Sequence, residues 1–467
     1  MERIDLHTHV FNVRYLPIAG VLHQRGHLPK IIARGIAKLL NWRTGDQIGH
    51  APAALQSPKD LALLSPESLA VAEANPAAAL AMATPPELID DPDVREALAM
   101  LGPGSLKSIK ETTTGDLDDA AAQAQFERLF AQVEKAERDS IFATGRDYLN
   151  WLRFLTHSEQ VIVDRLLGTY GKDVHLFVHH MMDMQHYYDP GDCYYDFVGE
   201  QLDRMKRLVD ANKGRLLTFV AWSPKRPNDI NIVRRAIDNG IAAGVKIYPP
   251  SGYQADEAMN DPLYDFASTD RGVPLFAHCT PEGMEARPGY GRRADPAYWR
   301  NVLHRADRNW KTLRLCLAHA GGDGPWFDPA LWPNSFAERA VALAGDPETP
   351  NVYLEFGFHP DILDVKKRNA FISRMAQEID RSQGRLANRI VYGTDWHMIE
   401  RLRNHQRYFE AFAQAFSKPP LAQYSERFFY KNAVEYLNLP RFAARRSAGD
   451  PVRKHVEKVI RIAAKKR

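Results

Sequence analysis

Two histidines, His7 and His9, lie two residues apart near the start of the chain, in the segment RIDLHTHVFN. A neutral imidazole nitrogen is a common ligand of Zn²⁺ and similar ions. If the segment is a β-strand, both side chains point to one face, because side chains alternate along a strand. That geometry suits two ligands of one metal ion, and it equally suits two surface histidines. The rest of the chain must decide between these interpretations.

Further ionisable residues recur at or near the ends of short apolar segments. Together with the first pair they are His7, His9, His179, His180, Lys246, His278, His319 and Asp395. Burying an ionisable group is costly unless the group is paired or bound to a metal. One such histidine would indicate a satisfied core residue, but several at the same end of successive segments indicate a functional site.

Eight apolar segments supply the strands that position these residues. They cover residues 4–9, 174–180, 215–222, 243–249, 273–279, 313–319, 351–357 and 389–395. From the second segment onward, helical stretches lie between them. Apolar strands that alternate with helices indicate a parallel sheet covered on both faces, and eight of them predict a (β/α)₈ TIM barrel. Such a barrel brings the carboxyl ends of its strands together, where active sites lie.

A long stretch between the first and second strands interrupts this pattern. It has no convincing strand and contains four helical patterns, at residues 28–42, 92–101, 120–138 and 146–155. We therefore predict a barrel of residues 1–11 and 171–440, with a large helical insertion after strand 1 at residues 12–170. Because βα loops build the site of a barrel, we expect the insertion to form a cap. The alternative is an unrelated helical domain in a tolerant loop.

The charge of the chain is concentrated at its end. The 467 residues carry a net charge of +3, but residues 441–467 hold ten Lys and Arg against Asp450 and Glu457. This basic C-terminal tail therefore carries +8 and the remainder −5. We expect the tail to be a helix that is solvated or packed on another subunit. No Phe, Tyr or Trp lies among the charges of residues 448–467, so we do not expect nucleic-acid binding.

The cysteine content and the distribution of apolar residues also indicate the cellular compartment. Three cysteines, Cys193, Cys279 and Cys316, are an odd number without a disulfide framework, which favours a reducing compartment. Charged and polar residues interrupt the N-terminal segment, and no apolar run reaches the length of a membrane span. We expect a cytoplasmic homo-oligomer that acts on a small-molecule substrate and does not enter a membrane.

The motifs, taken in order, resemble those of the amidohydrolase superfamily. The similarity rests on the His-x-His pair, on Lys246, His278 and His319, and on the Gly-Thr-Asp that ends at Asp395. The segments GVKIYP, ADPAYWRNVLHR, LRLCLAHAGG and RIVYGTDWH most resemble the branch that includes aminocarboxymuconate-semialdehyde decarboxylase. The resemblance covers residues 1–11 and roughly 174–440, and it does not cover the insertion or the tail.

This resemblance implies a metal-dependent enzyme. The implied ligands of one divalent ion are His7, His9, His278 and Asp395, with Asp395 and His319 as the catalytic residues. Imidazoles and a carboxylate suit zinc, with manganese or iron as alternatives. Lys246 has several interpretations. It could be carboxylated and bridge to a second metal held by His319, it could bind substrate, or it could be structural.

Two further residues are candidates for substrate binding. Arg226 follows the third strand, where its guanidinium could pair bidentately with a carboxylate, and His179 ends the second strand. A solvated loop arginine is the alternative for Arg226. The predicted function is hydrolysis of a C–O or C–N bond in a small, carboxylate-bearing metabolite. Non-oxidative decarboxylation by the same residues is the main alternative, and a non-catalytic barrel scaffold is a minor one.

Overall fold

The structure is a computed structural model that describes residues 2–24, 30–45, 91–92, 155–268, 271–400, 402 and 404–465. The chain forms two compact units. One unit comprises Met1–Val10, Val163–His186 and Phe197–Arg467, and the other comprises Phe11–Ile162 and Tyr187–Asp196.

The first unit contains eight parallel strands, each hydrogen-bonded to the next in chain order. The strands are β1 (Arg3–Thr8), β2 (Val174–His180), β3 (Leu216–Ala221), β4 (Gly244–Ile247), β5 (Leu275–Ala277), β6 (Leu315–Leu317), β7 (Val352–Glu355) and β8 (Ile390–Val391). Seven of the apolar segments predicted from the sequence contain one strand each and the first overlaps β1, so the predicted TIM barrel is confirmed.

Backbone hydrogen bonds connect the last strand to the first. The Leu6 amide donates to the Tyr392 carbonyl at 3.1 Å, and the Asp395 amide donates to the His7 carbonyl at 2.8 Å. Asp5 strengthens the same junction, because its carboxylate accepts the Thr394 amide at 2.9 Å and the Thr394 hydroxyl at 2.7 Å. The Gly-Thr-Asp segment is therefore attached directly to the His-x-His strand.

Helices follow the strands along the chain. They are α10 (Leu202–Ala211), α11 (Asp229–Asp238), α12 (Asp261–Ala267), α13 (Pro296–Leu303), α14 (Gly324–Phe327), α15 (Phe336–Gly345), α16 (Val365–Arg381), α17 (Trp396–Ile399) and α18 (Tyr408–Ala415). Local side chains begin several of them. Asp295 accepts the Ala297 amide ahead of α13, and Asp364 accepts two amides of the first turn of α16. The motif ADPAYW is thus a helix start with proline in the first turn.

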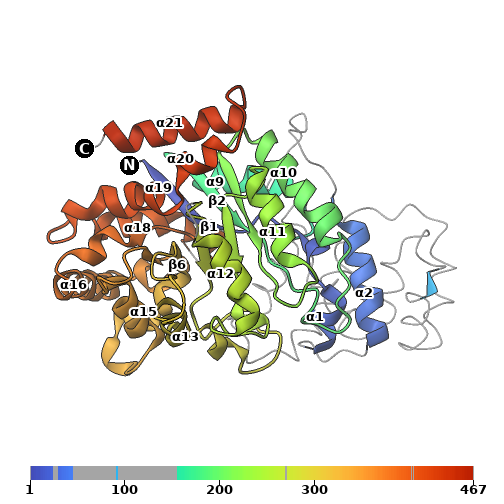
Figure 1. Cartoon of the computed structure of the whole chain (residues 1–467), viewed down its shortest axis with the longest axis horizontal. Helices are drawn as coiled ribbons and strands as arrows, with labels where there is room; N and C mark the ends of the chain where they lie inside the picture. Colours follow the sequence, from blue (N-terminus) through green and yellow to red (C-terminus); the bar gives the residue numbers. More distant parts are fainter. Residues whose placement is uncertain are drawn as a thin grey trace, which may run out of the picture. The chain divides into compact units, whose positions relative to one another are not determined.

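The C-terminal helices cover the starts of the barrel strands. They are α19 (Asn432–Tyr436), α20 (Leu439–Ala444) and α21 (Pro451–Lys465), and α20 and α21 lie beside one another near the N-terminus in Figure 1. Val452, Val456 and Val459 form a buried stripe along α21. The Tyr436 hydroxyl donates to the Leu275 carbonyl at 2.8 Å, at the start of β5. The basic C-terminal segment is thus helical as expected, but its buried valines pack on the barrel of its own chain, where a solvated helix or one packed on another subunit was expected.

The second unit contains most of the described part of the predicted insertion, whereas residues 163–170, in helix α9 (Glu159–Tyr170), belong to the first unit. The helices of the second unit are α1 (Ile18–Gln24) and α2 (Lys30–Arg43), and the latter coincides with the helix predicted at residues 28–42. The Arg14 guanidinium donates to the Tyr195 hydroxyl at 2.9 Å, so residues after β2 join this unit. Apart from their terminal residues 92 and 155, the other three predicted helices lie outside the described residues, and the cap remains a prediction.

Within the described ranges, no helix has both the length and the apolar character needed to cross a membrane.

Candidate metal centre

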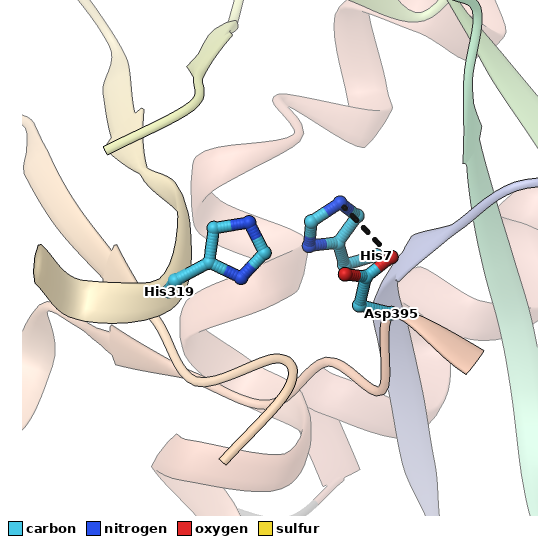
Figure 2. A group of neighbouring side chains, drawn as sticks. All are labelled: His7, His319 and Asp395. Atoms are coloured by element: carbon cyan, nitrogen blue, oxygen red, sulfur yellow. Dashed lines mark ion pairs between the residues drawn. The ribbon is translucent and has the colours of Figure 1, made fainter. Parts of the chain in front are cut away.

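Three predicted site residues converge at the carboxyl end of the barrel. His7 lies in β1, His319 follows β6 and Asp395 follows β8, and Figure 2 shows the two rings and the carboxylate facing a common space. One ligand atom from each residue lies within 4.8 Å of the other two. All three side chains are buried. This set of two imidazoles and one carboxylate could hold a metal ion.

Hydrogen bonding determines which nitrogen of His7 is available. Its Nδ1 lies 3.1 Å from Oε2 of Glu355, and the same oxygen accepts the His319 amide at 3.1 Å. When Glu355 is ionised its oxygens can only accept, so the proton of His7 then sits on Nδ1. The buried Nε2 is left with a lone pair, 3.9 Å from Oδ1 of Asp395, and has no hydrogen-bond partner among the described residues. A metal ion would satisfy this lone pair.

His9 is arranged in a similar way just beyond β1. Its Nδ1 lies 2.9 Å from the His180 carbonyl, which can only accept, so Nδ1 carries the proton. Its Nε2 lies 3.6 Å from Oδ1 of Asp395. The His-x-His pair therefore directs two Nε2 atoms at the same carboxylate oxygen.

His278 lies beside this group with a different orientation. It is buried just after β5, and its ring centroid lies 4.9 Å from that of His319. Its Nε2 lies 2.8 Å from the Glu282 carbonyl and is therefore protonated, which leaves Nδ1 as the nitrogen with a lone pair. The structure thus places His278 next to the three converging residues, and coordination by His278 would use Nδ1 in this arrangement.

The backbone of the site is strained. His319 has φ 59° and ψ 11°, and Ala320 has φ 46°, in the left-handed region that favours glycine. Asp395 also has a positive φ, of 50°. Such conformations in residues other than glycine cost free energy and concentrate at functional sites. The His319 ring is fixed as well, because its Nδ1 donates to the Gly357 carbonyl at 3.0 Å and leaves Nε2 unprotonated.

The electrostatic environment keeps the imidazoles neutral. Burial lowers the pKa of His7, His9 and His278 well below the usual value, and the nearby Lys246 ammonium lowers it further. Burial also lowers the pKa of His319 to about 4, although its hydrogen bond to Gly357 acts in the opposite direction. Neutral imidazoles are the protonation state that a metal site requires.

Comparison with known families agrees with this geometry. A family model described as Amidohydrolase matches residues 190–439, which is more than half of the chain. The chain belongs to this amidohydrolase family. The family is the branch that includes aminocarboxymuconate-semialdehyde decarboxylase, so the resemblance seen in the sequence is confirmed. Together with the buried His7, His319 and Asp395, it indicates a metal-dependent amidohydrolase-like enzyme.

Two solved structures are similar to this amidohydrolase. An uncharacterized TIM-barrel protein from Bordetella bronchiseptica has 17% identity and a TM-score of 0.41, over 60% of this chain and 82% of that one. An amidohydrolase from Burkholderia multivorans, with bound HEPES, has 11% identity and a TM-score of 0.40, over 62% and 91% of the two chains. No curated protein matches the sequence.

Lys246 places a cation in the same amidohydrolase site. It lies in β4, opposite Phe276 of β5, and its Nζ lies 4.6 Å from the centroid of that ring. Burial lowers its pKa to about 8, although Asp395 and Glu355 raise it. Within the described part of the chain, no carboxylate oxygen lies within 4.0 Å of Nζ. The structure thus places Lys246 close to the predicted ligands, with no carboxylate in ion-pair contact.

Arg226, a candidate for substrate binding, is engaged within its own chain. Its Nη1 donates to Asp229 at 2.7 Å, its Nη2 pairs with Asp183, and its Cζ lies 3.5 Å above the Phe197 ring. Two carboxylates therefore already occupy the guanidinium fork. A role for Arg226 in substrate binding stays a prediction, and it would require one of these pairs to open.

His179, the other candidate for substrate binding, is hydrogen-bonded to the backbone just after His9. Its Nδ1 accepts the Val10 amide at 3.1 Å, and its ring centroid lies 6.3 Å from that of His9. The hydrogen bond connects the end of β2 to the segment just after His9. Its contact with substrate stays a prediction.

Glu355 is a further residue of the site, to which the sequence assigned no role beyond a position that could line the pocket. It ends β7 and is fully buried, and it contacts both His7 and His319. Burial raises the pKa of this carboxyl well above its usual value, and the His319 amide acts in the opposite direction. The signal was present, since Glu355 is an ionisable residue at the end of an apolar segment. One carboxylate at the end of an apolar segment does not show which residues it contacts in the folded chain.

Proposed function

We propose that this protein is a hydrolase that uses one divalent ion to cleave a C–O or C–N bond of a small, carboxylate-bearing metabolite. The observation that carries the proposal is the buried Nε2 of His7, whose lone pair faces Asp395 and finds no hydrogen-bond partner among the described residues. A group of this kind is costly to bury unless a ligand satisfies it.

The donor set fits a metal ion such as zinc. We propose Nε2 of His7, Nε2 of His9 and Oδ1 of Asp395 as ligands, with His278 as the fourth. Neutral imidazoles and a carboxylate are suited to Zn²⁺, and manganese or iron are the alternatives. When bound, the ion would supply Lewis acidity, which lowers the pKa of a water molecule and polarises a carbonyl of the substrate.

The residues around this position would then handle protons. Asp395 can accept a proton from an attacking water molecule, because one of its oxygens remains after the other has coordinated. His319 presents an unprotonated Nε2, since its Nδ1 is held by the Gly357 carbonyl. It is therefore suited to accept a proton from the reacting group and to return it to the leaving group.

Lys246 supports a substrate with a negative charge. Its ammonium lies in a buried position without a carboxylate in ion-pair contact among the described residues, so a substrate carboxylate would offset the cost of burying it. Carboxylation of Lys246, with a second metal that includes His319 as a ligand, is the alternative. The two possibilities predict different numbers of metal ions per chain.

Non-oxidative decarboxylation is a second candidate, favoured by the family branch to which the chain belongs. The same residues would serve it, with Lys246 beside the carboxylate that is lost. Product analysis separates the two reactions. A decarboxylase releases carbon dioxide, whereas a hydrolase forms an acid together with an alcohol or an amine.

The test begins with elemental analysis of protein purified without chelators. We expect about one divalent ion per chain, and we expect a chelator to abolish turnover on a panel of lactones, amides and carboxylic acids until Zn²⁺, Mn²⁺ or Fe²⁺ is restored. His7→Asn should lose the ion. His455→Asn is the matched control, because His455 bonds the His175 carbonyl near the start of β2, away from the site. Turnover by metal-free protein would refute the proposal.

A further inference from the structure

We propose that Glu355 is a positioning residue of the metal centre. Its carboxylate selects the tautomer of His7 and at the same time holds the backbone of His319 in its left-handed conformation. The inference rests on the proposed function, because it concerns residues that would bind the ion or act beside it.

The geometry of one oxygen atom carries the argument. Oε2 of Glu355 accepts Nδ1 of His7 and the backbone amide of His319, each at 3.1 Å. Glu355 ends β7, His7 lies in β1 and His319 follows β6, so a single atom connects three strands of the barrel. Two of the three converging site residues therefore share one acceptor.

The first consequence concerns His7. A neutral imidazole carries one proton, on either Nδ1 or Nε2. With Nδ1–H bonded to Glu355, Nε2 presents its lone pair to the space beside Asp395. In the other tautomer, a lone pair would face the carboxylate and a proton would occupy the position of the ion. Partners of this kind fix both the tautomer and the orientation of a ligand.

The second consequence concerns His319. Its left-handed backbone costs free energy and persists only where surrounding contacts determine it. The amide of His319 is buried, and Glu355 is its acceptor. Without that oxygen a buried amide would lose its hydrogen bond, which disfavours this conformation. The position of the imidazole that we assign to proton transfer therefore depends on Glu355.

Two glycines reserve the space that the carboxylate needs. A Cβ atom added at Gly357 would lie 2.4 Å from Oε1 of Glu355 and 3.1 Å from Nδ1 of His7. One added at Gly393 would lie 1.9 Å from the same oxygen and 2.9 Å from Cβ of His7. Neither glycine has a positive φ, so their role is to leave room. The glycines of the EFG and YGTD segments thus accommodate the contact between Glu355 and His7.

The first experiment measures the dissociation constant for Zn²⁺ by competition with a chromophoric chelator. We expect Glu355→Ala to weaken binding about 10- to 100-fold, which is typical when the partner of a ligand is removed. Glu355→Gln, which keeps an acceptor oxygen in place, should recover part of the loss. The matched control is Glu378→Ala, because Glu378 is a buried carboxylate that pairs with Arg374 and Arg381 on α16 and should leave Zn²⁺ binding unchanged.

A second variant covers the case in which Glu355→Ala does not fold. Gly357→Ala leaves Glu355 in place but displaces its carboxylate, so it should also weaken Zn²⁺ binding. If the folded Glu355→Ala or Gly357→Ala protein binds Zn²⁺ as tightly as the parent, the inference is overturned. A purely structural role would lower thermal stability without changing the dissociation constant, and that result would overturn it too.

A readout that needs no metal separates this inference from the proposed function. In metal-free protein labelled with ¹⁵N-histidine, NMR spectra of the parent should show His7 protonated at Nδ1. Observation of the Nε2–H tautomer would overturn the inference. If the parent protein binds none of Zn²⁺, Mn²⁺ and Fe²⁺, the proposed function fails, while the tautomer of His7 still decides whether Glu355 acts as described.

Discussion

The interior of the barrel differs sharply between the two ends of the same strands. Phe276, Tyr353 and Val178 lie in the hydrophobic core, whereas His278, Glu355 and His180, two residues further along each strand, are buried polar groups. Residues at i and i+2 share one face, so each strand changes from apolar to polar in a single step. One end is covered by helices α19 to α21, and the other carries the candidate metal centre.

The apolar end of the barrel contributes to stability, whereas the polar end holds the groups that could carry out chemistry. Burial of apolar side chains stabilises the folded chain, whereas burial of neutral imidazoles and an ammonium costs free energy. The lowered pKa values of the histidines and of Lys246 express that cost. We infer that the core end maintains a site whose polar groups would not be stable by themselves. Four substitutions test this division.

The largest effect is expected at the polar end. His319→Asn should lower kcat by about 10²- to 10⁴-fold, or roughly 3–5 kcal/mol in the barrier, because an acid–base group is lost. The melting temperature should change little. The metal content of the variant then distinguishes a site with one ion from a site with two. An unchanged content supports one ion, whereas a fall from two ions to one supports a carboxylated Lys246. Unchanged rate and unchanged metal content would make His319 an ordinary core residue.

In the core we expect a substitution to lower stability and to leave metal binding unchanged. Leu217→Ala should destabilise the protein by about 2–5 kcal/mol, since a fully buried leucine leaves a cavity. The metal content per folded molecule should remain that of the parent. Denaturant unfolding measures the stability, and elemental analysis measures the metal content. Leu331→Ala is the control, because Leu331 is 72% exposed and should change stability by less than about 0.5 kcal/mol. Loss of metal from folded Leu217→Ala would show that the two ends are not separable.

Removal of the buried ammonium should raise stability. Lys246→Met replaces a desolvated cation with an apolar side chain of similar length, and we expect a gain on the order of 1–3 kcal/mol in the free energy of unfolding at pH 7. Turnover of anionic substrates should fall. A loss of stability together with loss of one metal ion would instead indicate that Lys246 is a ligand.

The smallest effect concerns pH. Burial lowers the pKa of His359 to about 3, with His319 acting in the same direction and the Gly357 hydrogen bond opposing them. Between this value and the usual 6.5 the unfolded chain binds the proton and the folded chain does not, so stability falls as pH decreases through this window. At pH 5.5 the effect is about 1 kcal/mol for one histidine. Unfolding of metal-free protein should therefore depend less on pH in His359→Gln. Identical slopes from pH 7.5 to 5.5 would contradict this.

Much of the fold is determined by the sequence alone. Each strand is a local apolar segment, and alternation with helical patterns favours a parallel barrel irrespective of distant contacts. The same locality explains why His7, His9, His278, His319 and Asp395 could be identified, because an ionisable residue at the end of an apolar strand is visible in the sequence. The basic segment at the C-terminus was also expected to be a helix, and the structure shows that its buried valines form an apolar stripe with helical spacing.

Tertiary structure decided the details on which chemistry depends. The partners of His7 and Asp5 are 348 and 389 positions away in the chain, so no local pattern could connect them. The available nitrogens of His9 and His319 also depend on partners 171 and 38 positions away, and the pairing of Arg226 with Asp183 spans 43 positions. Hydrogen bonds act over about 3 Å, whereas sequence patterns reveal only which residues share a strand or helix face. The sequence therefore determined which strand ends carry the chemistry, and closure of the barrel determined which atoms meet there.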